Sequence, residues 1–282
     1  MATAAKKQRR FNFRGSLCMP FAVFMLLFVI FPLCLIVYFA FTDSSGHLYL
    51  DNWGKIFTDS TKWLVIGRTF LIAFLTTVFC ILIAYPIAFI LSNGDRRIRK
   101  NKILVYIFIL PMWVNFVLRT MALRDMVNWF TSTLFNFQLT STHPLVGVVV
   151  GMVYDYLPFA ILPLYNQMIK MDKSQIEAAA DLGANPVQVF IKTIIPMTIP
   201  GIISACTMTF MPTMSSYVIA YYMGNGKMSI IGTEIEAYAG SGTQGYNPAS
   251  ILSLVMLFII GLSIFAEKLF DKKGETREGG IW

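Results

Sequence analysis

One acidic residue stands inside an otherwise apolar stretch of the sequence. Asp155 lies near the middle of segment 144–169, with Tyr156 beside it and Phe159 about one helical turn further on. The carboxylate attracts a cation, and each aromatic face adds about 0.5–2 kcal/mol of cation–π attraction. Within a membrane a charged acid costs about 2.5–3.5 kcal/mol on insertion scales, so it faces other helices or a polar cavity. We therefore predict that Asp155, Tyr156 and Phe159 line a path for a cation.

The residues that precede the acid indicate how a helix would present it. Gly147, Gly151 and Asp155 recur every four residues, which places them on one helix face. Small residues on that face let a second helix approach closely, so we expect Asp155 to face the bundle. The alternative is a purely structural ion pair between Asp155 and Arg119 or Arg124.

Other residues could extend such a path along neighbouring segments. Aromatic side chains on segments 103–123 and 197–222 offer cation-binding faces, although residues of this type near span ends also form interfacial belts. Acids in the outer segment 223–248 offer further charge. These candidates are Trp113, Tyr217, Tyr221, Glu234 and Glu236.

A membrane-embedded enzyme is the remote alternative from another class. Hydrolytic or transferase chemistry needs clustered histidines, acids or Ser–Lys groups, whereas His47 and His143 fall in separate predicted outer loops. The four cysteines lack the paired spacing of a metal site and are expected to act as small apolar filler. We therefore predict no catalytic residues and no metal site.

The composition indicates which elements position these residues. The 282-residue chain is 56% apolar and only 13% charged, against about 25% charged in an average soluble domain. Apolar runs of about 20 residues match a bilayer core of about 30 Å. We predict an all-α membrane protein whose six spans are 17–41, 64–91, 103–123, 144–169, 197–222 and 249–269. The first run is too long for a secretory signal, so it is expected to remain as a span.

The placement of positive charge predicts the topology. Seventeen of the 23 lysines and arginines flank alternate ends of the six spans. The positive-inside rule then puts both termini and the loop 172–196 in the cytoplasm. We expect a membrane domain at 17–270 between cytoplasmic tails at 1–16 and 271–282. The net charge of +8 is divided among these flanks instead of forming one basic face, which argues against nucleic-acid binding.

Prolines and glycines predict further features of the bundle. Prolines inside four spans bend helices, which favours a bundle around a cavity over simple packing kinks. The outer segment 42–63 is expected to lie partly along the membrane surface. In the glycine-rich outer segment 223–248, the apolar piece 230–235 is expected to dip towards the bilayer.

The loop 172–196 has the chemistry of two short helices. Asp172 or Ser174 can cap a helix that begins near Gln175, and alanines after Glu177 favour helix. Gly183 can end that helix in a left-handed conformation. The dipeptide at 185–186 then turns the chain into a second helix from about residue 187. This predicts a small exposed knob at the cytoplasmic face.

The same loop resembles the signature of ABC importer permeases. The matching residues are Glu177, Ala178 and Ala179, then Gly183, then an apolar-x-apolar-Pro sequence that ends at Pro196. Thr193 and Ile195 depart from it, where the family usually has Ile and Leu. In that family the loop is a coupling helix that docks on a separate ATPase subunit. The resemblance implies a type I ABC importer permease fold and a coupling role for Glu177, Ala178, Ala179, Asp181, Gly183 and Pro186.

The chain itself has no recognisable nucleotide site. The nearest string to a phosphate loop, 224–227, lacks the earlier glycine because Tyr221 occupies that position. The string also falls on the predicted outer side. We therefore expect a transport subunit that is not an enzyme and binds no cofactor, with ATP and Mg used by a partner ATPase.

A narrower resemblance concerns the solute. Segments 110–119, 157–165 and 195–201 look like those of spermidine/putrescine importer permeases, and the likeness covers most of 17–270. It implies a bacterial plasma-membrane complex with a second related permease, an ATPase dimer, an extracytoplasmic solute-binding protein and a polyamine substrate. The rival is a permease for another small solute of the anion or opine class. Arg119 keeps that rival open, whereas Asp155 opposes it.

Overall fold

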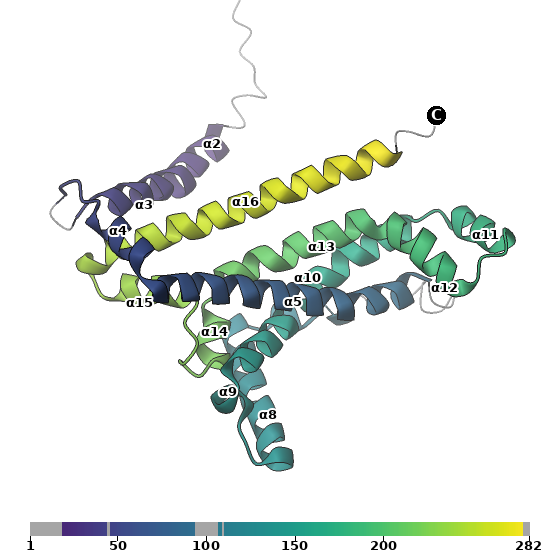
Figure 1. Ribbon diagram of the computed structural model, residues 1–282, viewed down its shortest axis with the longest axis horizontal. Helices are drawn as coiled ribbons and strands as arrows, with labels where there is room; N and C mark the ends of the chain where they lie inside the picture. Colours follow the sequence, from purple (N-terminus) through teal and green to yellow (C-terminus); the bar gives the residue numbers. More distant parts are fainter. Residues whose placement is uncertain (1–18, 44–45, 94–106, 109, 279–282) are drawn as a thin grey trace, which may run out of the picture.

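Five helical segments of the described chain are long and apolar enough to cross a membrane. They are Met19–Phe41, Ser60–Ser92, Pro144–Lys170, Pro186–Ser215 and Thr243–Phe265. These segments belong to a computed structural model that describes residues 19–43, 46–93, 107–108 and 110–278, with all its regular elements helical (Figure 1). They match five of the six predicted spans.

The middle of the bundle is built from three helices. These are α5 (Ser60–Asn93), α10 (Pro144–Lys170) and α13 (Ile195–Ser215), which pack against one another. Ala84 and Ala88 of α5 are fully buried, as are Met152 and Leu164 of α10. Small side chains on one helix opposite large ones on the next allow close packing. This core holds α10, and therefore Asp155, in place.

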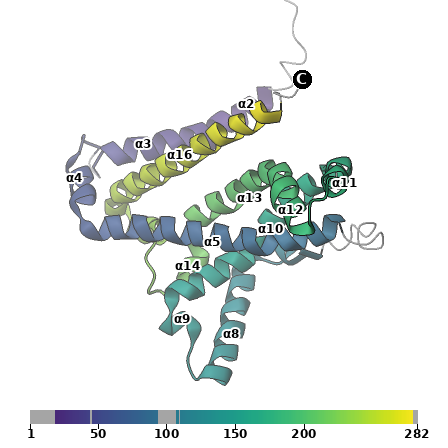
Figure 2. The same ribbon diagram turned by 45° about the vertical axis from the view of Figure 1, so that its right-hand side comes forward.

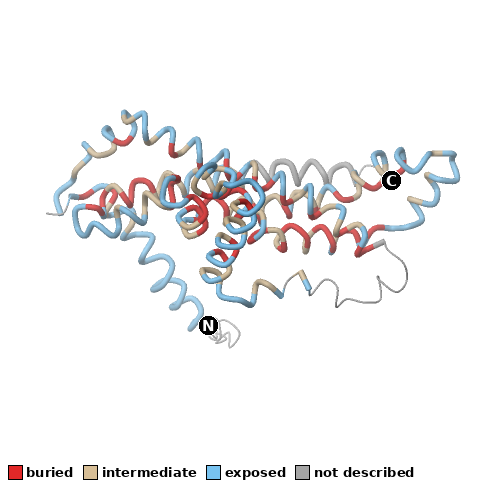
Figure 3. Tube along the Cα trace, turned by 90° about the horizontal axis from the view of Figure 1, so that it is seen from below, coloured by how far each residue is buried: buried red, intermediate tan, exposed pale blue. Residues whose placement is uncertain are grey.

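The first and last spans lie side by side at the edge of the bundle. The first comprises α2 (Met19–Met25), a π-helical turn η1 (Leu26–Ile30) and α3 (Phe31–Phe41), and α3 packs on α16 (Tyr246–Glu278). Its exposed surface stands out in Figure 3, and within 19–41 only Ala40 is buried. Apolar side chains that face outwards along a whole span fit a lipid or protein neighbour.

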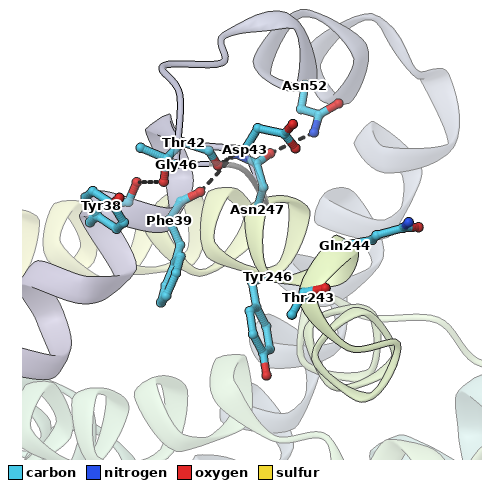
Figure 4. Close-up of a pocket in the computed structure, with 10 residues that line it drawn as sticks. All are labelled: Tyr38, Phe39, Thr42, Asp43, Gly46, Asn52, Thr243, Gln244, Tyr246 and Asn247. Carbon is cyan, nitrogen blue, oxygen red and sulfur yellow. Dashed lines mark hydrogen bonds between the residues drawn. The ribbon is translucent and has the colours of Figure 1, made fainter.

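One buried amide joins these two spans. Asn247, at the start of α16, donates from Nδ2 to the carbonyl oxygens of Phe39 at 2.9 Å, Ala40 at 3.3 Å and Thr42 at 3.0 Å. Its Oδ1 accepts a hydrogen bond of 2.8 Å from Asn52 (Figure 4). The carbonyls at the end of α3 have no intrahelical donors, so this single side chain satisfies several of them.

Replacement of Asn247 by Leu is expected to loosen the first span. A buried carbonyl that loses its donor costs about 1–3 kcal/mol, and the thermal unfolding midpoint of the purified complex should fall by several degrees. The matched control is Gln244→Leu, the same kind of change at an exposed amide three residues earlier. Equal midpoints for the two variants would show that Asn247 does not hold α3.

The predicted span 103–123 differs from the structure. Residues 103–106 and 109 lie outside the described residues, and the rest is not one helix. It contains a 3-10 turn η2 (Leu110–Trp113) and a bend, and α8 (Phe116–Phe135) begins only after them. Asn115 starts α8 because its side chain accepts from the amides of Val117 and Leu118 at 3.0 and 3.3 Å. The predicted single span is therefore replaced by a capped helix that runs to residue 135.

The predicted span 197–222 is also broken. α13 ends at Ser215, Ser216 is extended, and α14 (Val218–Met223) leaves in another direction, below the line of α13 in Figure 1. Pro212 cannot donate an amide hydrogen to the preceding turn, which weakens the last turns of α13. In a membrane, backbone of this kind is tolerated only where other protein groups surround it.

Two π-helical turns precede prolines. In η1 the amide of Phe31 bonds to the carbonyl of Leu26, just before Pro32. The second, η3 (Phe190–Ile194), joins α12 (Pro186–Val189) to α13 just before Pro196, and the amide of Ile195 bonds to Phe190. A proline removes a helical hydrogen bond, and a wider turn accommodates the resulting gap.

Short helices form one end and the flank of the bundle. They are α4 (Asp51–Thr58), α9 (Leu139–Thr142), α15 (Ile231–Gly240) and the 3-10 turn η4 (Thr243–Gly245). In the piece 230–235, Ile230 and Ile231 are buried, and the amide of Ile231 bonds to Thr69 of α5 at 2.9 Å. This apolar piece therefore packs inside the protein.

Candidate functional site

Asp155 forms an ion pair inside the bundle. Its side chain is completely buried, and Oδ1 lies 2.5 Å from Nε of Arg119, which is itself only 9% exposed. Thr120 donates a 3.0 Å hydrogen bond to the other oxygen, Oδ2. Thus α10 supplies the acid and α8 supplies a cation and a hydroxyl. Of the two structural partners considered from the sequence, the structure pairs Asp155 with Arg119.

Arg119 has a second set of contacts, on its own segment and on α10. Its Nη1 donates 2.9 Å to the carbonyl of Pro111, and its guanidinium lies 5.9 Å from the ring centres of both Phe116 and Tyr154. A guanidinium is planar and stacks readily on aromatic faces. The side chain is thus anchored partly to the acid and partly to groups that carry no charge.

The other arginine of α8 is not paired with the acid. Arg124 lies four residues after Thr120, on the same face of α8. Its Nε is buried and has no hydrogen-bond partner. Of the two arginines of α8, the structure therefore pairs Arg119 with Asp155.

Tyr156 connects Asp155 to the break between α13 and α14. Its hydroxyl donates 3.3 Å to the carbonyl of Pro212 in the last turns of α13, and Ser216 lies beside it. The ring of Phe159 is 6.2 Å from that of Tyr156. The structure thus brings together Asp155, Tyr156 and Phe159, as predicted, and adds Ser216 and Thr120, which the sequence reasoning missed. A polar residue at the end of an apolar run was the only available signal for Ser216.

The remaining aromatic candidates lie at the surface of this chain. Trp113 is 86% exposed in η2, and Tyr217 and Tyr221 are about half exposed at the start and in the middle of α14. The rings of Tyr221 and Tyr222 meet edge to face at 5.4 Å. None of these three candidates has a recorded side-chain contact with Asp155 within the described part of the chain, although η2 and α14 adjoin its helices.

The two outer acids belong to another part of the molecule. Glu234 of α15 pairs with Lys62 of α5 at 2.6 Å, and Lys62 also lies 4.9 Å from the ring centre of Tyr238. Glu236 is exposed on the same short helix. The structure therefore places Glu234 at a joint between α15 and α5 and does not join it to Asp155.

The small-residue face of α10 packs against α14, as the spacing predicted. A methyl group on Gly151 would lie 2.6 Å from Cγ of Met223, and one on Gly147 would lie 2.8 Å from the carbonyl oxygen of Met223. Both distances are far below van der Waals contact. The glycines thus permit the close approach that positions the break in the span next to Asp155.

The loop after α10 forms the expected knob. α11 (Lys173–Asp181) is capped by Asp172, whose side chain accepts 3.0 Å from the amide of Ser174. This hydrogen bond lowers the pKa of Asp172 below its usual value. Gly183 ends the helix with φ +83°, and the amides of residues 183 and 184 bond to the carbonyls of residues 180 and 179. This pattern is the Schellman motif, in which a left-handed glycine closes the helix.

A second cap starts the other half of the knob. Asn185 and Gln188 exchange hydrogen bonds of 2.8 and 3.0 Å between side chain and backbone, and Pro186 occupies the first turn of α12. Ile176 and Phe190 pack inwards on the core. Both ends of the knob are therefore fixed by local chemistry, and α11 and α12 project at one end of the bundle (Figures 1 and 2).

The knob presents small and apolar side chains to the outside. Leu182 is 89% exposed, with Val187 and Ile191 more than half exposed beside it. The predicted coupling residues Glu177, Ala178, Asp181, Gly183 and Pro186 are also exposed, whereas Ala179 is half-buried. Leu182, Val187 and Ile191 were not among the residues predicted from the sequence. An apolar surface on such a projection fits a protein partner.

One pocket lies at the end of the bundle opposite the knob (Figure 1). It measures about 210 Å³ and surrounds Asn247 where α3 meets α16 (Figure 4). Its lining residues are Tyr38, Phe39, Thr42, Asp43, Gly46, Asn52, Thr243, Gln244, Tyr246 and Asn247. Since its central amides bond to each other and to the α3 carbonyls, the pocket is part of the joint between the first and last spans. Among the described residues, no group of three or more histidines, cysteines and acids could hold a metal ion.

Comparison with known proteins places this geometry in context. No family model matches the chain. It is 28% identical over 268 residues to the spermidine/putrescine transport system permease protein PotB of Haemophilus influenzae, covering 89% of this chain and 93% of the relative. It is also 28% identical over 272 residues to PotB of Escherichia coli K12, covering 89% and 96%.

Solved structures support the same fold. A chain of a bacterial alginate ABC transporter in complex with an alginate pentasaccharide-bound periplasmic protein superposes with a TM-score of 0.70 at 13% identity, covering 92% of this chain and 94% of that one. A chain of the MetNI methionine ABC transporter in inward-facing conformations gives 0.55 at 17% identity, covering 77% and 99%. The chain is therefore similar over most of its length to PotB permease proteins, and it has the fold of the permease chains in these ABC transporters.

Proposed function

We propose that this chain forms part of the translocation path for polyamines in an ATP-driven importer of the bacterial plasma membrane. Similarity to spermidine/putrescine permeases over about nine-tenths of the sequence is the observation that carries this proposal. The chemistry around Asp155 is compatible with it, because the charge of Arg119 is already taken by the acid. An anion therefore gains little at Arg119.

The knob is proposed to couple transport to ATP hydrolysis. Glu177, Ala178, Ala179, Asp181, Gly183 and Pro186 lie on or beside the exposed α11–α12 projection, and Leu182 supplies an apolar anchor for a partner surface. In this proposal an ABC ATPase dimer, which uses ATP and Mg, binds the knob. A second related permease and an extracytoplasmic solute-binding protein complete the complex.

Six spans with both termini in the cytoplasm are proposed as the topology. α5, α10 and α16 all end on the side of α11 in Figure 1, whereas α4 and α15 lie at the opposite end. This arrangement requires one further crossing between α5 and α10. The broken segment around η2 and α8 is the proposed sixth span.

Cysteine labelling from outside is expected to report this topology. Single cysteines at Gly46 or Gly242, which are exposed on outer loops, should react with a membrane-impermeant reagent in intact cells. Cysteines at Lys7 or Lys273 should react only after the membrane is opened. Labelling of the second pair in intact cells would reject the cytoplasmic termini.

Uptake by membrane vesicles tests the function. Vesicles that contain the whole complex and the binding protein should take up labelled spermidine or putrescine only when ATP is present inside. Unlabelled polyamines should compete, and an opine or an inorganic anion should not. ATP-driven uptake of an opine or anion without polyamine uptake would assign the chain to the rival solute class.

A further inference from the structure

The buried polar atoms that lack partners gather in one region. Among the residues that the structure describes, four buried side-chain atoms have no hydrogen-bond partner: Arg119 Nε, Arg124 Nε, Asp155 Oδ1 and Ser216 Oγ. All belong to α8, to α10 or to the break after α13. Arg119 Nε and Asp155 Oδ1 are close enough for an ion pair but are not aligned for a hydrogen bond. Buried polar atoms are normally satisfied, so this concentration points to a missing ligand.

We propose that Asp155 accepts one ammonium group of the solute, and that Arg119 is an internal cation that occupies this position until the solute displaces it. This inference rests on the proposed function and assigns the site where the polyamine is recognised within the span. Arg119 is thus a specificity-determining residue, and the ion pair is the solute-free state of a binding site.

The acceptors around Asp155 suit an ammonium group better than a guanidinium. An ammonium has three donors that point in different directions. Ser216 Oγ has no hydrogen-bond partner, and Asp155 Oδ1 becomes available once Arg119 moves away. The carbonyls at the end of α13 provide further acceptors, because the last carbonyls of a helix lack internal donors. The negative end of the α13 dipole points to the same break, which favours a cation. Arg119 reaches only part of this set.

Other groups can hold the Arg119 side chain after the solute has displaced it from Asp155. The carbonyl of Pro111 already accepts from Nη1, and the rings of Phe116 and Tyr154 already flank the guanidinium. These three groups can keep the displaced side chain partly satisfied without Asp155. Because Asp155 carries a single charge, the ammonium group and the guanidinium compete for it, and the exchange replaces one cation by another.

A double variant separates a binding site from a structural pair. Asp155→Asn together with Arg119→Gln removes both charges and leaves two neutral groups that can hydrogen-bond. We expect the complex to assemble and hydrolyse ATP, and uptake of labelled spermidine at a sub-saturating concentration to fall at least tenfold. The matched control is Asp125→Asn, the same change at an exposed acid of α8, which should leave uptake unchanged.

A second variant keeps the charge and therefore folds even if the neutral pair does not. Arg119→Lys puts a resident ammonium beside Asp155 but loses the planar group that rests on Pro111 and the rings. The half-saturating spermidine concentration should rise severalfold with little change in maximal rate. The pair is only structural if spermidine uptake by the double variant is normal. The same conclusion follows if the half-saturating spermidine concentration of Arg119→Lys is unchanged.

These results are distinguishable from a failure of the proposed function. If the unmodified complex imports polyamines and the variants behave normally, only the assignment of Asp155 and Arg119 is wrong. If the unmodified complex imports no polyamine, the solute class itself is wrong.

Discussion

Replacement of Gly183 by Val is expected to abolish ATP-driven polyamine uptake while the complex still reaches the membrane. Gly183 has φ +83°, and nothing lies within 4 Å of a Cβ placed there. The obstacle is therefore conformational, since a left-handed backbone costs an ordinary residue about 1–2 kcal/mol and a β-branched one more. We expect the chain to relieve this strain by breaking the hydrogen bonds of the Schellman motif, which moves Leu182 and the start of α12.

Gly183→Asn is the matched control, because asparagine tolerates the left-handed region. Its uptake should stay within about twofold of normal if the shape of the knob is what matters, because asparagine can also close a helix in the left-handed conformation. Uptake and membrane content are measured in the same vesicles. Normal uptake by the valine variant, at normal membrane content, would remove the knob from the coupling route.

Replacement of Gly147 by Val is expected to lower the amount of folded protein severalfold. A Cβ at this position would lie 2.8 Å from the backbone oxygen of Met223 and 3.3 Å from Cα of Thr140. Backbone atoms cannot rotate away as a side chain does, so α9 and α14 would have to shift. Overpacking of this kind typically costs about 1–3 kcal/mol and occasionally more.

The comparison is Gly67→Val on α5, where the new side chain meets nothing within 4 Å. Both variants add the same volume to a helix, but only Gly147→Val adds it where another helix is already in contact. The measurement is the yield of monodisperse complex after detergent extraction, together with its thermal midpoint. Equal yields and midpoints for the two variants would mean that α14 does not sit on the glycine face of α10.

Four of the spans, and the α13 part of a fifth, were predictable because the physics that selects them is local. A run of apolar residues of sufficient length must be helical in a membrane, whatever surrounds it. The knob was predictable for the same reason, since Asp172, Gly183 and Asn185 act on backbone groups within four residues of themselves. Only the choice between Asp172 and Ser174 as cap needed the structure.

The two broken spans escaped prediction because the decisive groups compete with a strong apolar signal. Asn115 starts α8 in the middle of a predicted span, and the extended residue Ser216 follows a long, mostly apolar run. A hydropathy value is averaged over a window of residues, so it does not register a single residue that starts or ends a helix. The break is stable only because Tyr156 reaches the carbonyl of Pro212 and α14 finds the glycine face of α10, and both contacts join residues far apart in sequence.

The candidate site was half predictable for a similar reason. The cost of a buried acid indicated that Asp155 needs a partner, and the sequence left Arg119 and Arg124 as alternatives. They stand five residues apart on one helix, and only packing determines which of them faces the acid. Glu234 was included with Asp155 on charge alone, whereas its pairing with Lys62 depends on how α15 folds back on α5.

The amide of Asn247 also sets an order of events during synthesis. It holds the carbonyl of Phe39 across a sequence separation of 208 residues, and at about 5–20 residues per second a ribosome needs roughly 10–40 s to cover that distance. During this interval the first span is already in the membrane, and the carbonyl of Phe39 lacks its donor from Asn247. Completion of the nascent chain, and not the insertion of the first span, therefore closes the bundle, and a chain that stalls before residue 247 leaves the first span without this amide.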